Sequence, residues 1–429
     1  MSSVDPFGSL LDIDKPPYEW LAHSIAARHN VDDCPRVNVG APGTAQPYSA
    51  SVFNISAMSF GSLGAHAIEA LSTGAKKGNF YHDTGEGGVS PYHRSGGADL
   101  VWEIGSGYFG CRARDGTFDA ARFADVAQDP QIKMIEIKLS QGAKPGHGGV
   151  LPGAKVTAEI AATRGIPIGE TCFSPPGHSA FSTPLELMTF VARLRDLSGG
   201  KPVGIKFCVG NRWEILALCK AMLETGIRTD FMVVDGGEGG TGAAPAEFLD
   251  HVGTPLRQGL VLTRDALFGS GLKDDVRLAC SGKQTSAFAL ASSMALGADW
   301  VNTARGFMFS LGCIQSLNCH NNTCPTGIAT TDKGRQRGLF VADKAERVFN
   351  FHRNTVKALM EVVGAAGCEH PSQLTPRHIM HRVTEDITLP AHRAYDLLER
   401  NVLLDAPEDT KLAKEWAMAQ AASFRPLSR

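Results

Sequence analysis

Short apolar runs alternate with segments of helical periodicity along most of this 429-residue chain. Strands of a parallel sheet are buried on both faces, so continuous apolar runs of about four to eight residues are typical of them. Eight runs are predicted to be strands: 52–59, 79–84, 132–139, 166–173, 202–209, 231–236, 276–282 and 300–306. Eight strands that alternate with helices predict an α/β fold, specifically a closed (β/α)8 TIM barrel rather than an open sheet.

The segments between these runs contain residues that start and end helices. Thr183, Pro184 and Glu186 form a capping box with proline in the first helical position. Gly226 follows the helical segment 213–224, where a left-handed cap would end the helix. The longer segment between the second and third predicted strands contains no strand pattern and is interpreted as an insertion into the barrel.

Changes in pattern divide the chain into three parts. Residues 1–50 are rich in Pro and Asp and are predicted to form an N-terminal arm on the barrel surface. Residues 51–330 are predicted to form the barrel, with a cysteine-containing loop at 307–330 after the eighth strand. Beyond residue 330 the apolar runs stop and an i, i+3, i+4, i+7 pattern begins at Val356, so residues 331–429 are predicted to form a helical C-terminal extension.

Composition narrows the class of protein. The 42 Lys and Arg residues nearly balance the 44 Asp and Glu residues, and a net charge of −2 argues against a nucleic-acid or membrane-surface protein. Hydrophobic residues make up 43% of the chain, enough to build a large core. Neither a signal peptide nor an apolar run of about 18 residues is recognised, so a cytoplasmic protein with reduced or metal-bound cysteines is expected.

Three of the ten cysteines, Cys313, Cys319 and Cys324, lie within twelve residues, and a proline follows the last of them. This arrangement is typical of iron–sulfur loops and suits a [3Fe–4S] cluster, because a fourth iron would lack its own cysteine. Spacing alone leaves three alternatives open. These are a [4Fe–4S] cluster with a distant ligand such as Cys111, a zinc site that includes His320, and buried thiols without a metal.

Two glycine-rich sequences, beginning at Gly105 and Gly237, match the spacing G-x-G-x-x-G. A dinucleotide site needs a strand before this motif and a helix directly after it. The first match follows a segment predicted as helical, and Pro245 interrupts any helix after the second, so neither indicates an NAD site. The second match is interpreted as a loop at the barrel mouth, where bare backbone at Gly239 and Gly240 can approach a flat ring.

The pairs Gly282-Lys283 and Ala304-Arg305 follow the predicted seventh and eighth strands. The loops after these strands of a barrel commonly bind phosphate through backbone N–H groups. A phosphorylated cofactor is therefore expected there, although ordinary glycine-rich turns would have a similar sequence.

Lys138 and Lys206 each lie inside an otherwise apolar predicted strand. A buried ammonium group is unfavourable unless it meets an anion or an electron-rich ring. Together with Gln141 and Lys144, these lysines therefore indicate a pocket for an anion at the carboxyl ends of the strands. Glu86, after the second strand, is a candidate to bind a substrate ammonium group or to move a proton. The alternatives are lysine side chains that reach the rim and a Glu86 that only pairs with one of them.

Seven ordered motifs between about residues 50 and 330 resemble one known family, the FMN-binding synthase domain of glutamate synthase in its stand-alone, single-domain form. The motifs are SAMSFGS (56–62), DTGEGG (83–88), IKLSQGAKPG (137–146), LPGAKV (151–156), SPPGH (174–178), GGTGAAP (239–245) and GCxxxxxCHxNTCPTG (312–327).

The resemblance implies a barrel that holds FMN, with a [3Fe–4S] cluster bound by Cys313, Cys319 and Cys324. It implies that Lys206 lies near the N1/O2 edge of the flavin, where a cation stabilises the anionic reduced ring. The other matching cofactor residues are Ala57, Met58, Ser59, Lys138, Gln141, Gly239, Gly240 and Thr241 near the ring and Gly282, Lys283, Ala304 and Arg305 around the phosphate.

In this family, reduced FMN transfers a hydride from N5 to C2 of the 2-imino acid formed from 2-oxoglutarate and ammonia. The resemblance implies an oxidoreductase with the same activity. The matching residues are Glu86 and Lys144 in catalysis and Arg164, Lys144, Gln141, Val150 and His147 in substrate binding.

Three positions depart from the family pattern. His147 stands where the family has Glu, Val150 where it has a Gln that helps to hold the oxo acid, and Asp83 where it has Asn. Loss of one polar contact typically costs about 1–3 kcal/mol of specific binding. A related FMN oxidoreductase that acts on another C–N substrate, such as an N-substituted amino acid, is therefore an alternative. A non-catalytic electron-transfer subunit is a further alternative, against which the presence of Glu86, Lys144 and Arg164 argues.

The resemblance covers only the synthase domain, so we expect a protein without the amidotransferase domain, the glycine-repeat β-helix and the NAD(P)H-oxidising domain of longer family members. We therefore expect an external electron donor, either ferredoxin or a reductase subunit, and a separate amidotransferase subunit as a candidate source of ammonia. The substrate is expected to be a small 2-oxo or amino acid, and the protein a homo-oligomer with no nucleic-acid or membrane partner.

Overall fold

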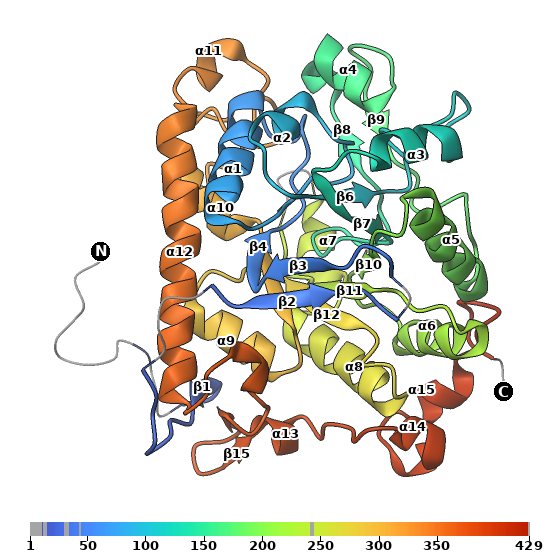
Figure 1. The fold of residues 1–429 in the computed structure, drawn as a ribbon, viewed down its shortest axis with the longest axis vertical. Helices are drawn as coiled ribbons and strands as arrows, with labels where there is room; N and C mark the ends of the chain where they lie inside the picture. The colour runs from blue at the N-terminus through green and yellow to red at the C-terminus, as the bar shows by residue number, and fades with distance from the viewer. Residues whose placement is uncertain (1–10, 12–14, 30–33, 43, 241–243, 428–429) are drawn as a thin grey trace.

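The computed structural model describes residues 11, 15–29, 34–42, 44–240 and 244–427. Eight parallel strands close into a barrel, which confirms the predicted (β/α)8 TIM barrel (Figure 1). In order around the barrel the strands are β4 (Phe53–Ile55), β5 (His82–Asp83), β6 (Leu100–Ile104), β7 (Ile132–Lys138), β10 (Val203–Phe207), β11 (Phe231–Asp235), β12 (Arg277–Ser281) and β13 (Trp300–Thr303), which pairs with β4 again.

Helices surround the barrel on its outer side (Figure 1). They are α1 (Ala65–Gly78), α2 (Pro91–Ser95), α3 (Ala120–Ala127), α4 (Ala158–Arg164), α5 (Pro184–Leu197), α6 (Arg212–Thr225), α7 (Ala246–His251), α8 (Leu256–Gly269), α9 (Ala287–Ala295), α10 (Arg305–Leu311) and α11 (Lys333–Gln336). The predicted capping box of α5 is present, because Thr183 Oγ1 accepts the Glu186 N–H at 3.1 Å and Glu186 Oε2 accepts the Thr183 N–H at 3.2 Å. Gly226 ends α6 with φ of 70°, as predicted. Among the described residues, no helix has the length and apolar character needed to span a membrane.

The predicted strand at 166–173 is wrong. Only Cys172–Phe173 (β9) is extended there, and it pairs with Val150–Leu151 (β8) in a small two-stranded antiparallel sheet that is not part of the barrel. Gly165 and Gly169 have φ of 68° and 75°, in the left-handed region. These two turns divide an apolar sequence that otherwise has the composition of a strand.

The strand that the sequence pattern missed is β6, which lies inside the segment interpreted as an insertion. Its sequence, LVWEI, is apolar except for Glu103, much as β7 and β10 are apolar except for charged residues, so the same pattern could have predicted this strand. The glycine-rich sequence that begins at Gly105 therefore follows a strand and not a helix, which corrects that prediction. No helix begins directly after it, because α3 starts only at Ala120, so a dinucleotide site is still not indicated.

Segments from both ends of the chain form one small sheet beside the barrel. In this sheet β1 (Tyr18–Leu21) pairs with β14 (Ile379–Arg382), which pairs with β15 (Thr388–Pro390). The segment after residue 330 is therefore not purely helical as predicted, although its main element is the long helix α12 (Val341–Ala365), which packs along α1 (Figure 1). The remaining short helices are α13 (Ala391–Ala394), α14 (Val402–Asp405) and α15 (Ala413–Met418).

A hairpin of β2 (Arg36–Val39) and β3 (Tyr48–Ser51) closes the amino end of the barrel. Its residues join a buried cluster with side chains from five barrel strands and the residue before β5: Val39, Tyr48, Ala50, Tyr81, Val101, Met134, Phe231, Val233, Ala279 and Trp300. The polar atoms there are paired, because Trp300 Nε1 donates to the Tyr81 hydroxyl at 2.8 Å and that hydroxyl donates to Asn302 Oδ1 at 2.7 Å. This end of the barrel is therefore filled, and any ligand site must lie at the carboxyl end.

Candidate functional site

A cavity of about 510 Å³ lies at the carboxyl ends of the barrel strands. Loops that are far apart in the sequence form its walls. The predicted site residues that line it are Ala57, Met58, Ser59, Glu86, Lys138, Gln141, Lys144, Val150, Lys206, Gly239, Gly240, Gly282, Lys283, Ala304, Arg305, Cys313 and Cys319. The structure thus brings most of the predicted residues into one space.

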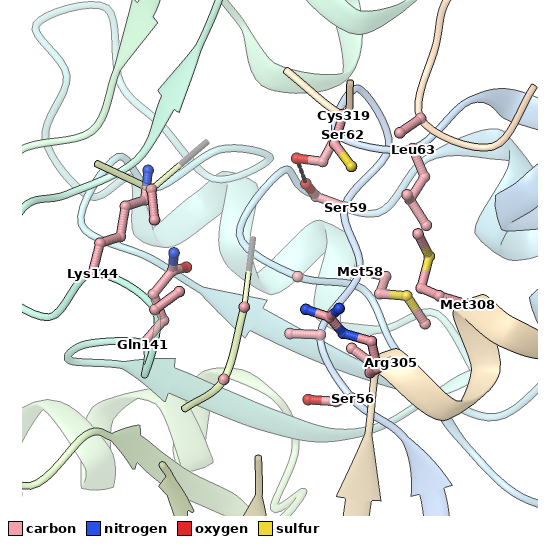
Figure 2. A pocket seen from close by; sticks show the side chains of 18 of the residues that line it. Ser56, Met58, Ser59, Ser62, Leu63, Gln141, Lys144, Arg305, Met308 and Cys319 are labelled. Atoms are coloured by element: carbon pink, nitrogen blue, oxygen red, sulfur yellow. Dashed lines mark hydrogen bonds between the residues drawn. The ribbon is translucent and has the colours of Figure 1, made fainter. Parts of the chain in front are cut away.

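Figure 2 shows how the labelled residues are arranged around this cavity. Gln141 and Lys144, from the segment after β7, lie on one side. Met58 and Arg305 lie on the opposite side, close to the start of α10. Cys319 lies on a third side, near Ser62. The cavity therefore connects three groups of residues that differ in chemistry: lysine and amide, arginine, and thiol.

Glu86 and Lys138 form a mostly buried ion pair on the cavity wall. Lys138 Nζ lies 3.2 Å from Glu86 Oε2 and donates to Gln141 Oε1 at 2.6 Å. Burial opposes ionisation of Glu86, but the positive charges of Lys138 and Arg164 outweigh it and hold the pKa of this carboxyl below its usual value. Glu86 is therefore an ionised group that both pairs with a lysine and faces the cavity.

Lys144 is buried, with 4% of its surface exposed, and it lines the cavity. Within the described residues its ammonium group has no hydrogen bond and no ion pair. Burial lowers the pKa of Lys144, and the charge of Glu86 opposes this effect. Because a buried charge without a partner is unfavourable, this end of the cavity is suited to receive an anion.

Lys283 and Arg305 form a second cationic region of the cavity. The Arg305 guanidinium donates to Gln315 Oε1 at 3.4 Å, and among the described residues neither Arg305 nor Lys283 has a carboxylate within ion-pair distance. Gly240 packs against this guanidinium, since a Cβ atom there would lie 2.5 Å from Arg305 Nη2. Two cations without anionic partners beside bare backbone fit a phosphate group.

Arg164, predicted to bind the substrate, does not line the cavity. It is 4% exposed and packs behind the wall, where Nη2 donates to the Phe60 carbonyl at 3.3 Å and lies 3.5 Å from Ser59 Oγ. Its guanidinium also lies over the ring of Phe109, 5.0 Å from the ring centre. Arg164 thus lies behind Ser59, which lines the cavity, and its role in substrate binding stays a prediction.

Other predicted residues also lie away from the cavity. His147 packs edge-on against Phe248, with ring centres 5.0 Å apart, and its Nδ1 is buried without a hydrogen bond among the described residues. Cys111, considered as a distant cluster ligand, is fully buried and does not line the cavity, whereas His320, considered for zinc, does. Thr241 lies outside the described residues.

The floor of the cavity is an ion network inside the barrel. Lys206 on β10 lies 2.8 Å from Glu103 on β6 and 3.8 Å from Glu136 on β7. Burial opposes protonation of Lys206, but the charges of Glu103 and Glu136 outweigh it and raise the pKa of Lys206 well above its usual value. Lys206 is therefore a permanent cation at the cavity floor and does not reach the rim.

Lys155 is a second buried lysine, in the turn η1 (Gly153–Lys155), beside the cysteines. It is 1% exposed and donates only to carbonyls, those of Ser62 at 2.7 Å, Cys319 at 3.1 Å and Ala329 at 3.4 Å. No carboxylate in the described part of the chain pairs with it. The missing negative charge fits an anionic group bound by the neighbouring thiolates.

The three predicted cluster cysteines lie close together. Burial raises the pKa of the Cys319 thiol, and the neighbouring thiols of Cys324 and Cys313 raise it further. At Cys324, burial is outweighed by hydrogen bonds from the Thr326 hydroxyl and from backbone N–H groups, which lower the pKa of its thiol. All ten cysteines of the chain are free. The thiol of Cys319 lies near those of Cys313 and Cys324, and Cys319 and Cys324 also lie near Lys155, so this donor set fits an iron–sulfur cluster.

Glu103, Glu136 and Lys155 are site residues that were not predicted from the sequence. Glu103 and Glu136 lie inside largely apolar strands, as Lys138 and Lys206 do. Their burial could therefore have been predicted in the same way as that of the two lysines. Lys155 lies in the LPGAKV motif, but no pattern along the chain indicates which group it faces.

Comparisons with known proteins agree with the motifs. The family model described as a conserved region in glutamate synthase matches residues 40–369. The glutamate synthase large subunit-like protein YerD of Bacillus subtilis is 44% identical over 328 residues, which cover 76% of this chain and 62% of YerD. The archaeal glutamate synthase (NADPH) of Methanocaldococcus jannaschii is 33% identical over 316 residues, 73% of this chain and 58% of that protein. The chain thus spans about three fifths of the length of these relatives.

Solved structures agree with the fold. A mandelate oxidase bound to (S)-4-hydroxymandelic acid superposes with a TM-score of 0.50 at 14% sequence identity. The match covers 84% of this chain and 86% of the oxidase. At this level of identity the similarity shows the fold alone.

Proposed function

The chain belongs to the glutamate synthase family, and from this premise we propose that it is an oxidoreductase with FMN and a [3Fe–4S] cluster that reduces a 2-imino acid to an amino acid. The imino acid would form from 2-oxoglutarate and ammonia. One observation carries the proposal: a single cavity joins Lys144, Lys283 and Arg305, which have no carboxylate partner among the described residues, with Cys313 and Cys319 near Lys155.

In this proposal, FMN supplies the chemistry of hydride transfer from N5 when it is bound. Lys283 and Arg305, with the backbone at Gly282 and Ala304, would hold its phosphate. The positive charge of Lys206 would stabilise negative charge on the ring. Because the pKa of Lys206 is raised well above its usual value, this charge is present throughout the neutral pH range. The 510 Å³ cavity has the size range of cofactor pockets.

On the substrate side, Lys144 would bind the carboxylate of the acid and thereby gain the partner that it lacks. Glu86, held ionised by Lys138, would orient the nitrogen of the substrate and accept or return a proton there. Gln141 is already fixed by Lys138 and would contribute its amide N–H groups. Arg164 would act indirectly, because its contacts with Ser59 and Phe60 fix the position of the segment that lines the cavity.

Cys313, Cys319 and Cys324 would hold the [3Fe–4S] cluster, whose chemistry is one-electron transfer. We propose an external electron donor, either a ferredoxin or a reductase subunit. The archaeal relative is named for NADPH, so an NADPH-dependent reductase is the first donor to test. Ammonia could be supplied by a separate amidotransferase subunit.

Val150 favours a second candidate function. This apolar side chain lines the cavity, as does Leu249. 2-Oxoglutarate has only two methylene groups to place against such a surface, whereas an N-substituted amino acid would also bury its substituent there. The alternative is an FMN oxidoreductase that acts on such a C–N substrate.

The test is anaerobic titration of the purified protein. We expect stoichiometric FMN, an iron–sulfur electron paramagnetic resonance signal, and reoxidation of the dithionite-reduced flavin by 2-oxoglutarate with ammonia. Reoxidation only by other imino acids, or reduction of the flavin by an N-substituted amino acid, would support the second function. Protein without flavin or iron after reconstitution would contradict both.

A further inference from the structure

The ion network in the barrel contains more acid than base. Asp83, Glu103 and Glu136 are each 1% exposed, and their carboxyl oxygens lie within 4.8 Å of one another. Lys206 is the ammonium among them, 2.8 Å from Glu103 and 3.8 Å from Glu136. Three ionised carboxylates beside one ammonium would leave a net charge of about −2 in a medium of low dielectric constant, which is strongly unfavourable. At least one carboxyl group must therefore hold a proton.

Hydrogen bonding indicates which carboxyl groups hold it. Glu103 has the closest contact with Lys206, so it is the ionised member. Asp83 Oδ1 accepts the Gly85 N–H at 3.0 Å. Glu136 Oε1 is buried and has no hydrogen-bond partner among the described residues. A proton shared between Glu136 and Asp83 would supply the missing hydrogen bond.

The directions in which the pKa values of Asp83 and Glu136 shift agree with a proton shared between them. Burial and the charge of Glu103 raise the pKa of Asp83 to about 7, and burial and the charge of Asp83 raise the pKa of Glu136 well above its usual value. The Tyr81 phenol also faces the two acids, and Asp235 on β11 faces Lys206. From β4, β12 and β13, the neighbouring polar side chains are the neutral Asn54, Ser281 and Asn302.

The pair is connected to the cavity, because Glu103 and Lys206 both line it. We propose that Asp83 and Glu136 share one proton beneath the cofactor site and bind a second proton when negative charge enters the cavity. The second half of this inference rests on the proposed function, because the negative charge is that of the reduced cofactor.

Two electrons from the external donor and one proton at N5 leave the reduced ring with one negative charge. A second proton, from solvent, forms an O–H bond on the Asp83 carboxylate and breaks no bond in the protein. Reduction of the bound cofactor by two electrons then takes up two protons. Without the shared proton of Asp83 and Glu136 it would take up one.

The shared proton is tested by infrared spectroscopy of the protein without cofactor at about pH 7, where a buried carboxylic acid has a carbonyl band distinct from that of carboxylates. We expect this band in the unmodified protein and its loss in Asp83→Asn and in Glu136→Gln. Asp235→Asn is the matched control, because Asp235 accepts hydrogen bonds from Ser281 and Gly142 and lies outside the pair. It should keep the band. Absence of the band from the unmodified protein, or its survival in both variants, would overturn the shared proton.

The coupling is tested in the flavin-loaded protein by measuring proton uptake with an indicator dye during reduction by dithionite. Dithionite releases protons as it is oxidised, so this release is measured with free flavin and subtracted. After the subtraction we expect uptake of two protons per electron pair in the unmodified protein and of one in Asp83→Asn. Equal uptake in the two proteins would overturn the coupling, while the infrared result decides the shared proton separately. Failure to bind flavin would contradict the proposed function and the coupling together, and leave the infrared test unaffected.

Discussion

The two ends of the barrel are built from the same eight strands but differ in how complete they are. At the amino end, the β2–β3 hairpin covers a buried cluster around Trp300, and the polar atoms of Trp300, Tyr81 and Asn302 pair with one another. At the carboxyl end, Lys144 and Lys155 are buried ammonium groups without a carboxylate partner in the described chain. At the amino end this cluster fills the barrel without a ligand, whereas at the carboxyl end Lys144 faces an open cavity with no hydrogen-bond or ion-pair partner among the described residues, so that end is suited to bind anions. Stability and ligand binding should therefore be separable by mutation.

The largest effect is expected from Trp300→Ala at the amino end. Removing a large, fully buried side chain leaves a cavity and the Tyr81 hydroxyl without its donor, and should lower the free energy of unfolding by about 3–5 kcal/mol. Urea unfolding measures this loss. The FMN dissociation constant, measured by fluorescence on the folded variant, should not change. Flavin loss without a loss of stability would show that the two ends are not independent.

The difference between the ends also explains what the sequence could predict. Continuous apolar runs identified seven of the eight barrel strands, and lysines inside such runs identified the charged end. The hairpin that closes the amino end was interpreted only as part of a surface arm, because two four-residue strands have too short a pattern to indicate what they cover. Local patterns report burial, but they do not report the partner against which a segment is buried.

Arg164 and Glu103 show the same limit in the site itself. The motif placed Arg164 on a helix after LPGAKV, but only the fold decides that its guanidinium packs behind Ser59 and Phe60. Glu103 lies in β6, the strand that was not predicted, and only the closed barrel brings it to Lys206 on β10 as its ion-pair partner. A charged residue inside an apolar strand can therefore indicate the carboxyl end of the barrel, where the cavity lies.

The second prediction removes an unpartnered charge at the open end. Lys144→Met should weaken binding of the substrate acid by about 2–3 kcal/mol, roughly 30- to 150-fold, because a charge-assisted contact is lost. Stability should not fall, since the ammonium group has no partner among the described residues. Titration calorimetry and urea unfolding measure the two quantities. Lys133→Met, on the same segment but paired with Asp99 on the outside, is the control and should leave acid binding unchanged.

The third prediction concerns the charge beside the cysteines. Lys155→Met should shorten the lifetime of the cluster under chelator by about 5- to 30-fold, equivalent to about 1–2 kcal/mol, because an anionic cluster loses its nearest cation. Iron release and the electron paramagnetic resonance signal follow this loss. Lys201→Met is a matched control, since Lys201 is also buried and donates only to carbonyls, those of Ala127 and Asp129, but lies elsewhere. Equal cluster lifetimes in the two variants would refute a charge effect at Lys155.

The smallest effect is expected in the pH dependence of stability at Asp83, which lies between the two ends. Its pKa rises from 3.8 to about 7 on folding, chiefly through burial, so between these values the folded protein holds a proton that the unfolded chain has released. The contribution of Asp83 to stability is therefore greatest below pH 3.8 and declines as the pH rises toward 7. Asn is neutral throughout, so Asp83→Asn should gain about 1–2 kcal/mol over the unmodified protein between about pH 5 and pH 6.5. Urea unfolding at several pH values gives this difference, and a difference that is constant with pH would mean that Asp83 is ionised in the folded barrel.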